Sequence, residues 1–234
     1  MKATGSCRIR RGIVQRLVRG SPKPEIVVRF HVPLPSIDIN EKVSISEAFC
    51  YYKNMKPRFV YVHGNETTHW SFAWAKWLKD ELDNLGYETF FETMPDSILT
   101  RSKYWLPFLK DHVKVGKNDV IIGWSSGAVV AMRYAEQNQI KGSILISPSY
   151  TDLDGDPLEV QSGYYDTPWD WNAIKARQEK IALFYGDNDP YISQEEFGDI
   201  AGFLSPEEYK VTDGGHFVDY NEFPELLDYI KRTY

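Results

Sequence analysis

A five-residue motif, Gly-Trp-Ser-Ser-Gly at residues 123–127, constrains this chain more than any other feature. The apolar run before it, residues 118–123, predicts a buried strand, and the run after it, residues 128–136, predicts a helix. A Gly-x-Ser-x-Gly turn between a strand and a helix is typical of a nucleophile elbow, in which the serine hydroxyl stands above the edge of a sheet. Its glycines leave room where the strained turn meets neighbouring backbone. We therefore expect Ser125 to be a nucleophile.

A serine nucleophile needs a general base, and in a fold with such an elbow the chain order is serine, acid, histidine. The chain holds five histidines, of which only His216 lies after Ser125. His216 stands in a glycine-flanked loop, residues 212–217, between a predicted strand and the last predicted helix. The chain order therefore predicts His216 as the base.

The acid is expected in the loop after the short apolar strand 181–185, where two aspartates stand close together. Pro190 restricts the backbone of the residue before it, so Asp189 would hold its carboxylate on a stiff support. Asp187 is the alternative, because Asp-x-Asp-Pro is also ordinary turn chemistry. We prefer Asp189 as the acid and expect Asp187 to tighten the turn.

Length and composition exclude several classes of protein. The 234 residues suffice for one sizeable core, and no stretch approaches the roughly 18 apolar residues of a membrane-spanning helix. Cys7 and Cys50 are too few for a disulfide framework and lie in no metal-ligand spacing. The chain has no phosphate loop, dinucleotide fingerprint or zinc pattern. We therefore expect no cofactor and no metal ion.

The net charge of −6 conceals an uneven distribution along the chain. Residues 1–24 carry seven of the 27 basic side chains and none of the 33 acidic ones. The rest is therefore acidic, which argues against a nucleic-acid surface. The Arg-rich amphipathic start resembles a mitochondrial presequence, a helix for anionic membranes or a disordered basic tail. We expect residues 1–56 to be a basic extension, partly disordered or targeting, of a cytoplasmic or mitochondrial protein.

From residue 57 to 234, strand and helix patterns alternate, which is the signature of a mostly parallel sheet with helices on both faces. Strands are predicted at 58–62, 87–92, 118–123, 141–147, 181–185 and 208–212, and helices at 69–85, 101–113, 128–136, 193–203 and 222–232. The pattern breaks down between residues 149 and 177. One interpretation of that stretch is a partial cap in which Tyr164 and Trp169 face the substrate. The other is a packed excursion, a long connection whose aromatic side chains only cover the edge of the sheet.

Five motifs recur here in the order found in one family. They are Ile121 to Glu136, Trp-Leu-Pro-Phe at 105–108, Ser-Gly-Tyr-Tyr at 162–165, Trp-Asp-Trp at 169–171 and Thr-Asp-Gly-Gly-His-Phe at 212–217. Together they resemble the retinoblastoma-binding protein 9 family of serine hydrolases, over residues 58–234. The resemblance implies an α/β-hydrolase fold and serine hydrolase activity without a cofactor. It carries the family's nucleophile, acid and base onto Ser125, Asp189 and His216.

Three departures from that family bear on function. Trp124 stands where the family commonly has His, and because it lines the elbow we expect a different substrate preference. The loop His63-Gly-Asn-Glu66 is shorter than the family's glycine-rich loop. Residues 112–117 lack the Leu-x-Cys-x-Glu form of the human member's retinoblastoma-binding segment, so that partner is not carried over.

These assignments predict acyl transfer from small esters or amides through a covalent intermediate. His216 would accept the proton of Ser125 and later give it to the leaving group, while Asp189 orients the imidazole. The competing class is a non-catalytic protein-binding module that retains the fold.

The remaining site residues are expected around the elbow. The oxyanion would accept hydrogen bonds from the backbone amide of Ser126 and from that of Asn65 or Glu66. Trp124 and His63 are expected to contact substrate, together with the aromatic stretch described above.

Overall fold

The computed structural model describes residues 56–67 and 69–234, and the expected N-terminal extension lies outside them except for its last residue, Lys56. Six strands form one parallel sheet in the order β2-β1-β3-β4-β5-β6. They are β1 (Arg58–Val62), β2 (Glu88–Phe91), β3 (Asp119–Trp124), β4 (Gly142–Ile146), β5 (Lys180–Gly186) and β6 (Glu207–Val211). The helices are α2 (Ala75–Asn84), α3 (Ser102–Pro107), α4 (Ser126–Ala135), α5 (Pro157–Ser162), α6 (Trp171–Ala176), α7 (Gln194–Leu204) and α8 (Pro224–Thr233), with a π-helix, η1 (Phe108–Val113), directly after α3.

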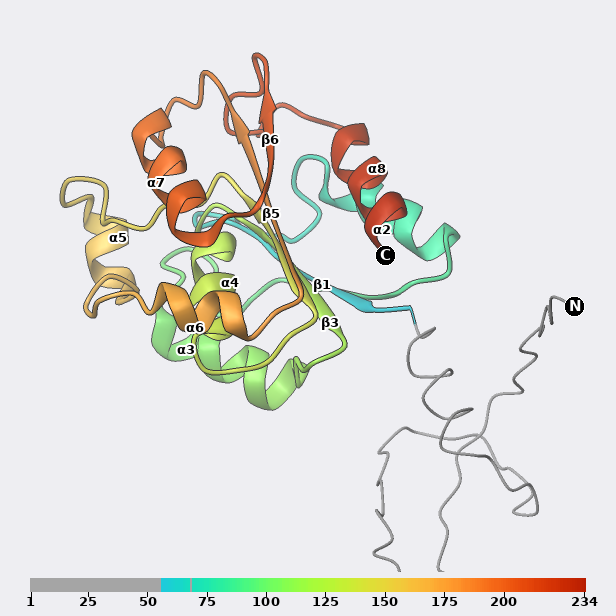
Figure 1. Cartoon of the computed structure of the whole chain (residues 1–234), viewed down its shortest axis with the longest axis horizontal. Helices are drawn as coiled ribbons and strands as arrows, with labels where there is room; N and C mark the ends of the chain where they lie inside the picture. The colour runs from blue at the N-terminus through green and yellow to red at the C-terminus, as the bar shows by residue number, and fades with distance from the viewer. Residues whose placement is uncertain (1–55, 68) are drawn as a thin grey trace, which may run out of the picture. The chain divides into compact units, whose positions relative to one another are not determined.

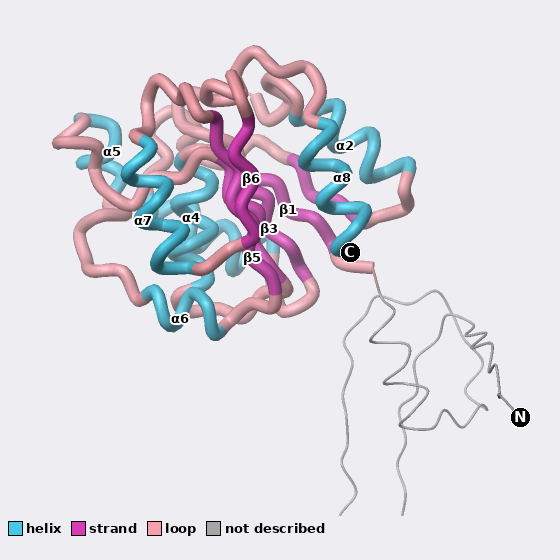
Figure 2. Tube along the Cα trace, turned by 45° about the horizontal axis from the view of Figure 1, so that its top comes forward, coloured by secondary structure: helices cyan, strands magenta, loops and turns pink. Residues whose placement is uncertain are grey.

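Helices cover both faces of the sheet, as Figures 1 and 2 show. Successive strand residues point to opposite faces, so Phe59 and Tyr61 of β1 pack with α2 and α8, whereas Val60 and Val62 pack with α3, η1, α4, α6 and α7. A parallel sheet buried on both faces explains why the strands are apolar runs rather than alternating patterns. None of the helices in the described part of the chain is long and apolar enough to cross a membrane.

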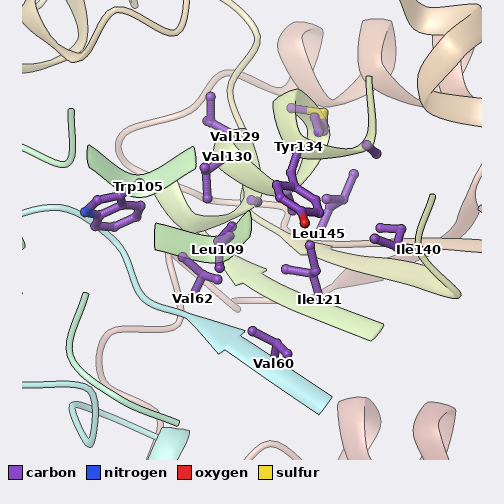
Figure 3. Close-up of a cluster of buried hydrophobic side chains, with 14 of the residues drawn as sticks. Val60, Val62, Trp105, Leu109, Ile121, Val129, Val130, Tyr134, Ile140 and Leu145 are labelled. Atoms are coloured by element: carbon purple, nitrogen blue, oxygen red, sulfur yellow. The ribbon is translucent and has the colours of Figure 1, made fainter. Parts of the chain in front are cut away.

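Helix α4, which follows the serine motif, lies at the centre of its face. All of its residues are buried. Figure 3 shows Val130 and Tyr134 of this helix in a cluster with Trp105 of α3, Leu109 of η1 and Ile121 of β3. The Tyr134 hydroxyl donates a hydrogen bond to the carbonyl of Val115 at 2.8 Å. The helix that follows Ser125 therefore rests on a tightly packed support.

The predicted order of strands and helices is confirmed, and every strand end lies within one residue of its prediction. The first helix is shorter than predicted. Residues 69–74 form turns, with Ala73 at φ 53°, and the helix begins only at Ala75. The helix predicted across Pro107 changes there into η1. Two short helices, α5 and α6, lie in the stretch where the sequence showed no pattern.

The aromatic stretch after β4 is a packed excursion. Arg133 of α4 donates hydrogen bonds to the carbonyls of Tyr164 and Thr167, each at 2.7 Å. Its guanidinium lies 3.5 Å from the centre of the Trp169 ring, which stacks on Trp171 at 5.1 Å. The Tyr164 side chain is buried. Of the two interpretations of this stretch, the observed packing matches the one in which its aromatic side chains cover the body of the protein.

Candidate active site

Ser125 occupies a strained turn between β3 and α4. Its backbone has φ 55° and ψ −123°, a combination that non-glycine residues avoid. The Ser125 amide donates to the carbonyl of Ile146 at 2.8 Å, and its carbonyl accepts from the amides of Ala128 and Val129 at 2.8 and 3.2 Å. The neighbouring strand and the helix therefore hold the turn in place, and the context that the motif predicts is present.

The glycines of the motif are required by close backbone contacts. A Cβ atom on Gly123 would collide with the carbonyl of Gly127, and one on Gly127 would collide with the carbonyl of Val62. Gly64, in the loop after β1, approaches the serine itself. A Cβ atom there would lie 3.1 Å from the Ser125 Cβ and 3.7 Å from its Oγ. The backbone of this loop therefore passes beside the serine hydroxyl.

His216 and Asp189 meet at the C-terminal edge of the sheet, where Nδ1 of the imidazole lies 2.8 Å from Oδ2 of the carboxylate. The other oxygen, Oδ1, accepts hydrogen bonds from the amides of Tyr191 and Ile192 at 2.9 and 3.1 Å. Burial raises the pKa of Asp189, but the bond to His216 and the two amides outweigh it, so this pKa lies below its usual value. The carboxylate is therefore ionised and fixed in direction.

Asp187 and Asn188 join the loop of Asp189 to the loop of His216 by other contacts. Oδ1 of Asp187 accepts the amide of Asp213 at 2.9 Å, and Oδ1 of Asn188 accepts the amide of Gly215 at 2.7 Å. The structure thus brings Asp189, rather than Asp187, to the imidazole, and it uses Asp187 to hold the two loops together.

Trp124 supports the histidine loop. The side chain is buried, and its Nε1 donates to the backbone carbonyl of His216 at 3.0 Å. The ring stacks on Phe72, whose centre lies 5.9 Å away and which is 51% exposed. The indole N–H is therefore used within the protein, and the expected contact of the Trp124 ring with substrate stays a prediction. On the solvent side, sequence reasoning missed Phe72 and Tyr191, the latter edge-on to the His216 ring at 5.0 Å.

His63 is also a supporting residue. Its Nδ1 lies 2.7 Å from the carbonyl oxygen of Gly64, and its Nε2 accepts the amide of Met94 at 2.9 Å. These partners require a neutral ring with its proton on Nδ1. Burial lowers the pKa of His63, against the opposing effect of the bond to Gly64. Both nitrogens are occupied, so this histidine braces the loop beside Ser125 instead of contacting substrate as expected.

The backbone amides expected to bind the oxyanion differ in whether they already donate a hydrogen bond within the protein. Ser126 is the first residue of α4, and the first amides of a helix have no acceptor within it. The helix N-terminus also carries partial positive charge, which favours an oxyanion. In the loop after β1, the amide of Glu66 already donates to the carbonyl of Ile98 at 3.2 Å. The geometry therefore favours the amides of Ser126 and Asn65 over that of Glu66.

Within residues 56–67 and 69–234, no group of three or more His, Cys, Asp and Glu side chains is arranged to hold a metal ion. The two histidines that follow β1 have different partners. His63 binds backbone groups of Gly64 and Met94, whereas Nδ1 of His69 lies 2.7 Å from Oγ of Ser71.

Comparison with known proteins points to one family. The family model described as serine hydrolase matches residues 60–232. Serine hydrolase RBBP9 of Rattus norvegicus is 39% identical over 169 residues, which cover 72% of this chain and 88% of that protein. The ydeN gene product of B. subtilis matches with a TM-score of 0.66 at 22% identity, over 75% of this chain and 97% of that one. Est1E of Butyrivibrio proteoclasticus, solved with ferulic acid bound, matches with a TM-score of 0.61 at 16% identity, over 77% and 89%.

Proposed function

This chain belongs to the serine hydrolase family, and we propose that it cleaves small esters or amides through an acyl-enzyme intermediate. Two observations carry the proposal: the bond of 2.8 Å between His216 and the buried carboxylate of Asp189, and the strained turn that holds Ser125. The residue before Ser125, Trp124, also donates to the His216 carbonyl at 3.0 Å. A serine hydroxyl is a weak nucleophile at neutral pH and needs such a base to accept its proton. The three residues also follow the chain order of this fold.

In the first half of the reaction, Oγ of Ser125 attacks the carbonyl carbon of the substrate while Nε2 of His216 accepts the hydroxyl proton. Asp189 keeps the proton on Nδ1 and stabilises the imidazolium. The bond to the leaving group then breaks, and the imidazolium gives its proton to the departing alcohol or amine. A water molecule, activated by the same imidazole, hydrolyses the ester on Ser125 and restores the free serine.

The negative charge on the carbonyl oxygen develops next to two backbone amides. We assign these to Ser126, at the start of α4, and to Asn65, in the loop that passes beside Ser125. One donor in an oxyanion hole is worth about 2.7–4 kcal/mol of transition-state stabilisation. Because such bonds strengthen only as charge develops, they raise kcat rather than substrate affinity.

Turnover of an activated ester tests this function with two neighbouring serines as a matched pair. Ser125→Ala removes the nucleophile and should abolish turnover. Ser126→Ala keeps the backbone amide and should retain most of it, since only a side chain buried at the helix start changes. A folded wild-type protein that turns over no ester or amide would favour the alternative, a protein-binding module that retains the fold. Loss of turnover in Ser126→Ala alone would move the nucleophile to that residue.

A further inference from the structure

A buried carboxylate in the excursion after β4 reaches the loop beside Ser125. Glu159 of α5 is 7% exposed, and its Oε1 accepts a hydrogen bond from Nδ2 of Asn65 at 3.2 Å. Its Oε2 accepts from the hydroxyl of Tyr165 at 2.9 Å. That hydroxyl lies 2.8 Å from Oγ of Ser149, just after β4. One carboxylate thus joins three segments at the edge of the sheet where the candidate site lies.

A charged Glu159 carboxylate at this buried position destabilises the folded state. The ion pairs between described residues do not include Glu159, so only neutral groups hold it. Burial raises the pKa of Glu159, and the bond from Tyr165 opposes this. A buried charge without a basic partner costs stability. A role in fold stability alone therefore explains this side chain poorly.

Asn65 connects the carboxylate to the reacting centre. The peptide bond between Gly64 and Asn65 is trans, so its C=O and N–H point in opposite directions. His63 binds the Gly64 carbonyl on one side of this peptide at 2.7 Å. Glu159 holds the Asn65 side chain on the other, and Thr67 Oγ1 donates to the Asn65 carbonyl at 3.1 Å. The direction of the Asn65 N–H is therefore fixed from both ends.

We propose that Glu159 is a positioning residue of the oxyanion hole, which holds Asn65 so that its amide points at the oxygen that becomes charged during attack by Ser125. The inference rests on the proposed function. Glu159 acts through Asn65, without touching the substrate or the reacting atoms. Its effect belongs to the transition state, so kcat should change while KM stays nearly constant. A displacement of about 1 Å in a catalytic group can cost roughly a hundredfold in rate.

The test measures kcat, KM and the free energy of unfolding of full-length variants. Glu159→Ala should lower kcat about 10- to 100-fold with KM within about twofold of wild type. Glu159→Gln keeps an amide that can pair with Asn65 and should restore most of kcat. Asn65→Ala keeps the backbone amide but loses the side-chain bond, so it should resemble Glu159→Ala. The double variant should be no worse than either single one, because both break the same contact.

Gln161→Ala is the matched control, because Gln161 lies exposed on the same helix and its side chain donates to the Pro157 carbonyl, at 2.9 Å. It should leave kcat unchanged. A stability loss in Glu159→Ala without a change in kcat would overturn the positioning role, and so would additive losses in the double variant. If Glu159→Ala does not fold, Asn65→Ala decides, and a wild-type kcat there overturns the inference. Turnover that survives in Ser125→Ala would instead refute the proposed function and the inference with it.

Discussion

Asp187 and Asp189 stand two residues apart on one loop, and their different partners predict different effects on catalysis. Asp189→Asn preserves the shape of the side chain but favours the wrong tautomer of His216, which should lower kcat by a factor on the order of 10⁴. Asp187→Asn keeps an oxygen that can accept the amide of Asp213, so its loss should be small. Turnover of an activated ester, measured on both variants after their folding is checked by circular dichroism, compares them.

The reverse pattern would exchange the two roles. Near-normal turnover by Asp189→Asn together with a collapse in Asp187→Asn would make Asp187 the orienting acid. Equal and mild losses would place the orienting group elsewhere, with Asp213 next to test because it lies three residues before His216.

The candidate site is assembled from the C-terminal ends of β1, β3, β5 and β6. Because all strands of the sheet run parallel, these ends meet at one edge even though they are far apart in sequence.

Apolar runs predicted the strands well, because a sheet covered on both faces needs them. The first helix was predicted too long, since Phe72 and Trp74 match helical spacing but lie in turns of the loop before α2. Helices as short as α5 and α6 leave too few residues for a periodic signal.

Trp124, the last residue of β3, ties that strand to the loop after β6. Trp124→Phe should keep most of the ring packing and remove the donor to the His216 carbonyl. The unpaired carbonyl should cost about 1–3 kcal/mol in free energy of unfolding. Because the loop that holds the imidazole loosens, kcat should fall as well. Urea denaturation and ester turnover measure the two effects. Phe72→Leu, which changes the stacking partner but keeps the donor, is the control, and equal behaviour of both variants would contradict this role.

Across the chain as a whole, residue order predicted Ser125 and His216, because this fold fixes the order of its nucleophile, acid and base. The same order left Asp187 and Asp189 as alternatives, and the preference for Asp189 came from the stiff backbone before Pro190. The supporting contacts could not be predicted in the same way. Asn65 and Glu159 are 94 residues apart, and Trp124 and the His216 carbonyl are 92 apart. Such pairs depend on how loops pack over the sheet, and neither periodicity nor spacing contains that information. His63 likewise looked available for substrate until its two backbone partners were visible.

The residue to which a fluorophosphonate attaches tests the proposed triad most directly. An activated serine attacks phosphorus as it attacks a carbonyl carbon, so peptide mass spectrometry of the labelled full chain should place the adduct on Ser125. Ser125→Ala should not label, and Ser126→Ala should label as the wild type does. An adduct on Ser126 of the folded wild-type protein would contradict the proposed triad. The triad would also be contradicted if the folded protein stays unlabelled while another serine hydrolase in the same reaction is labelled.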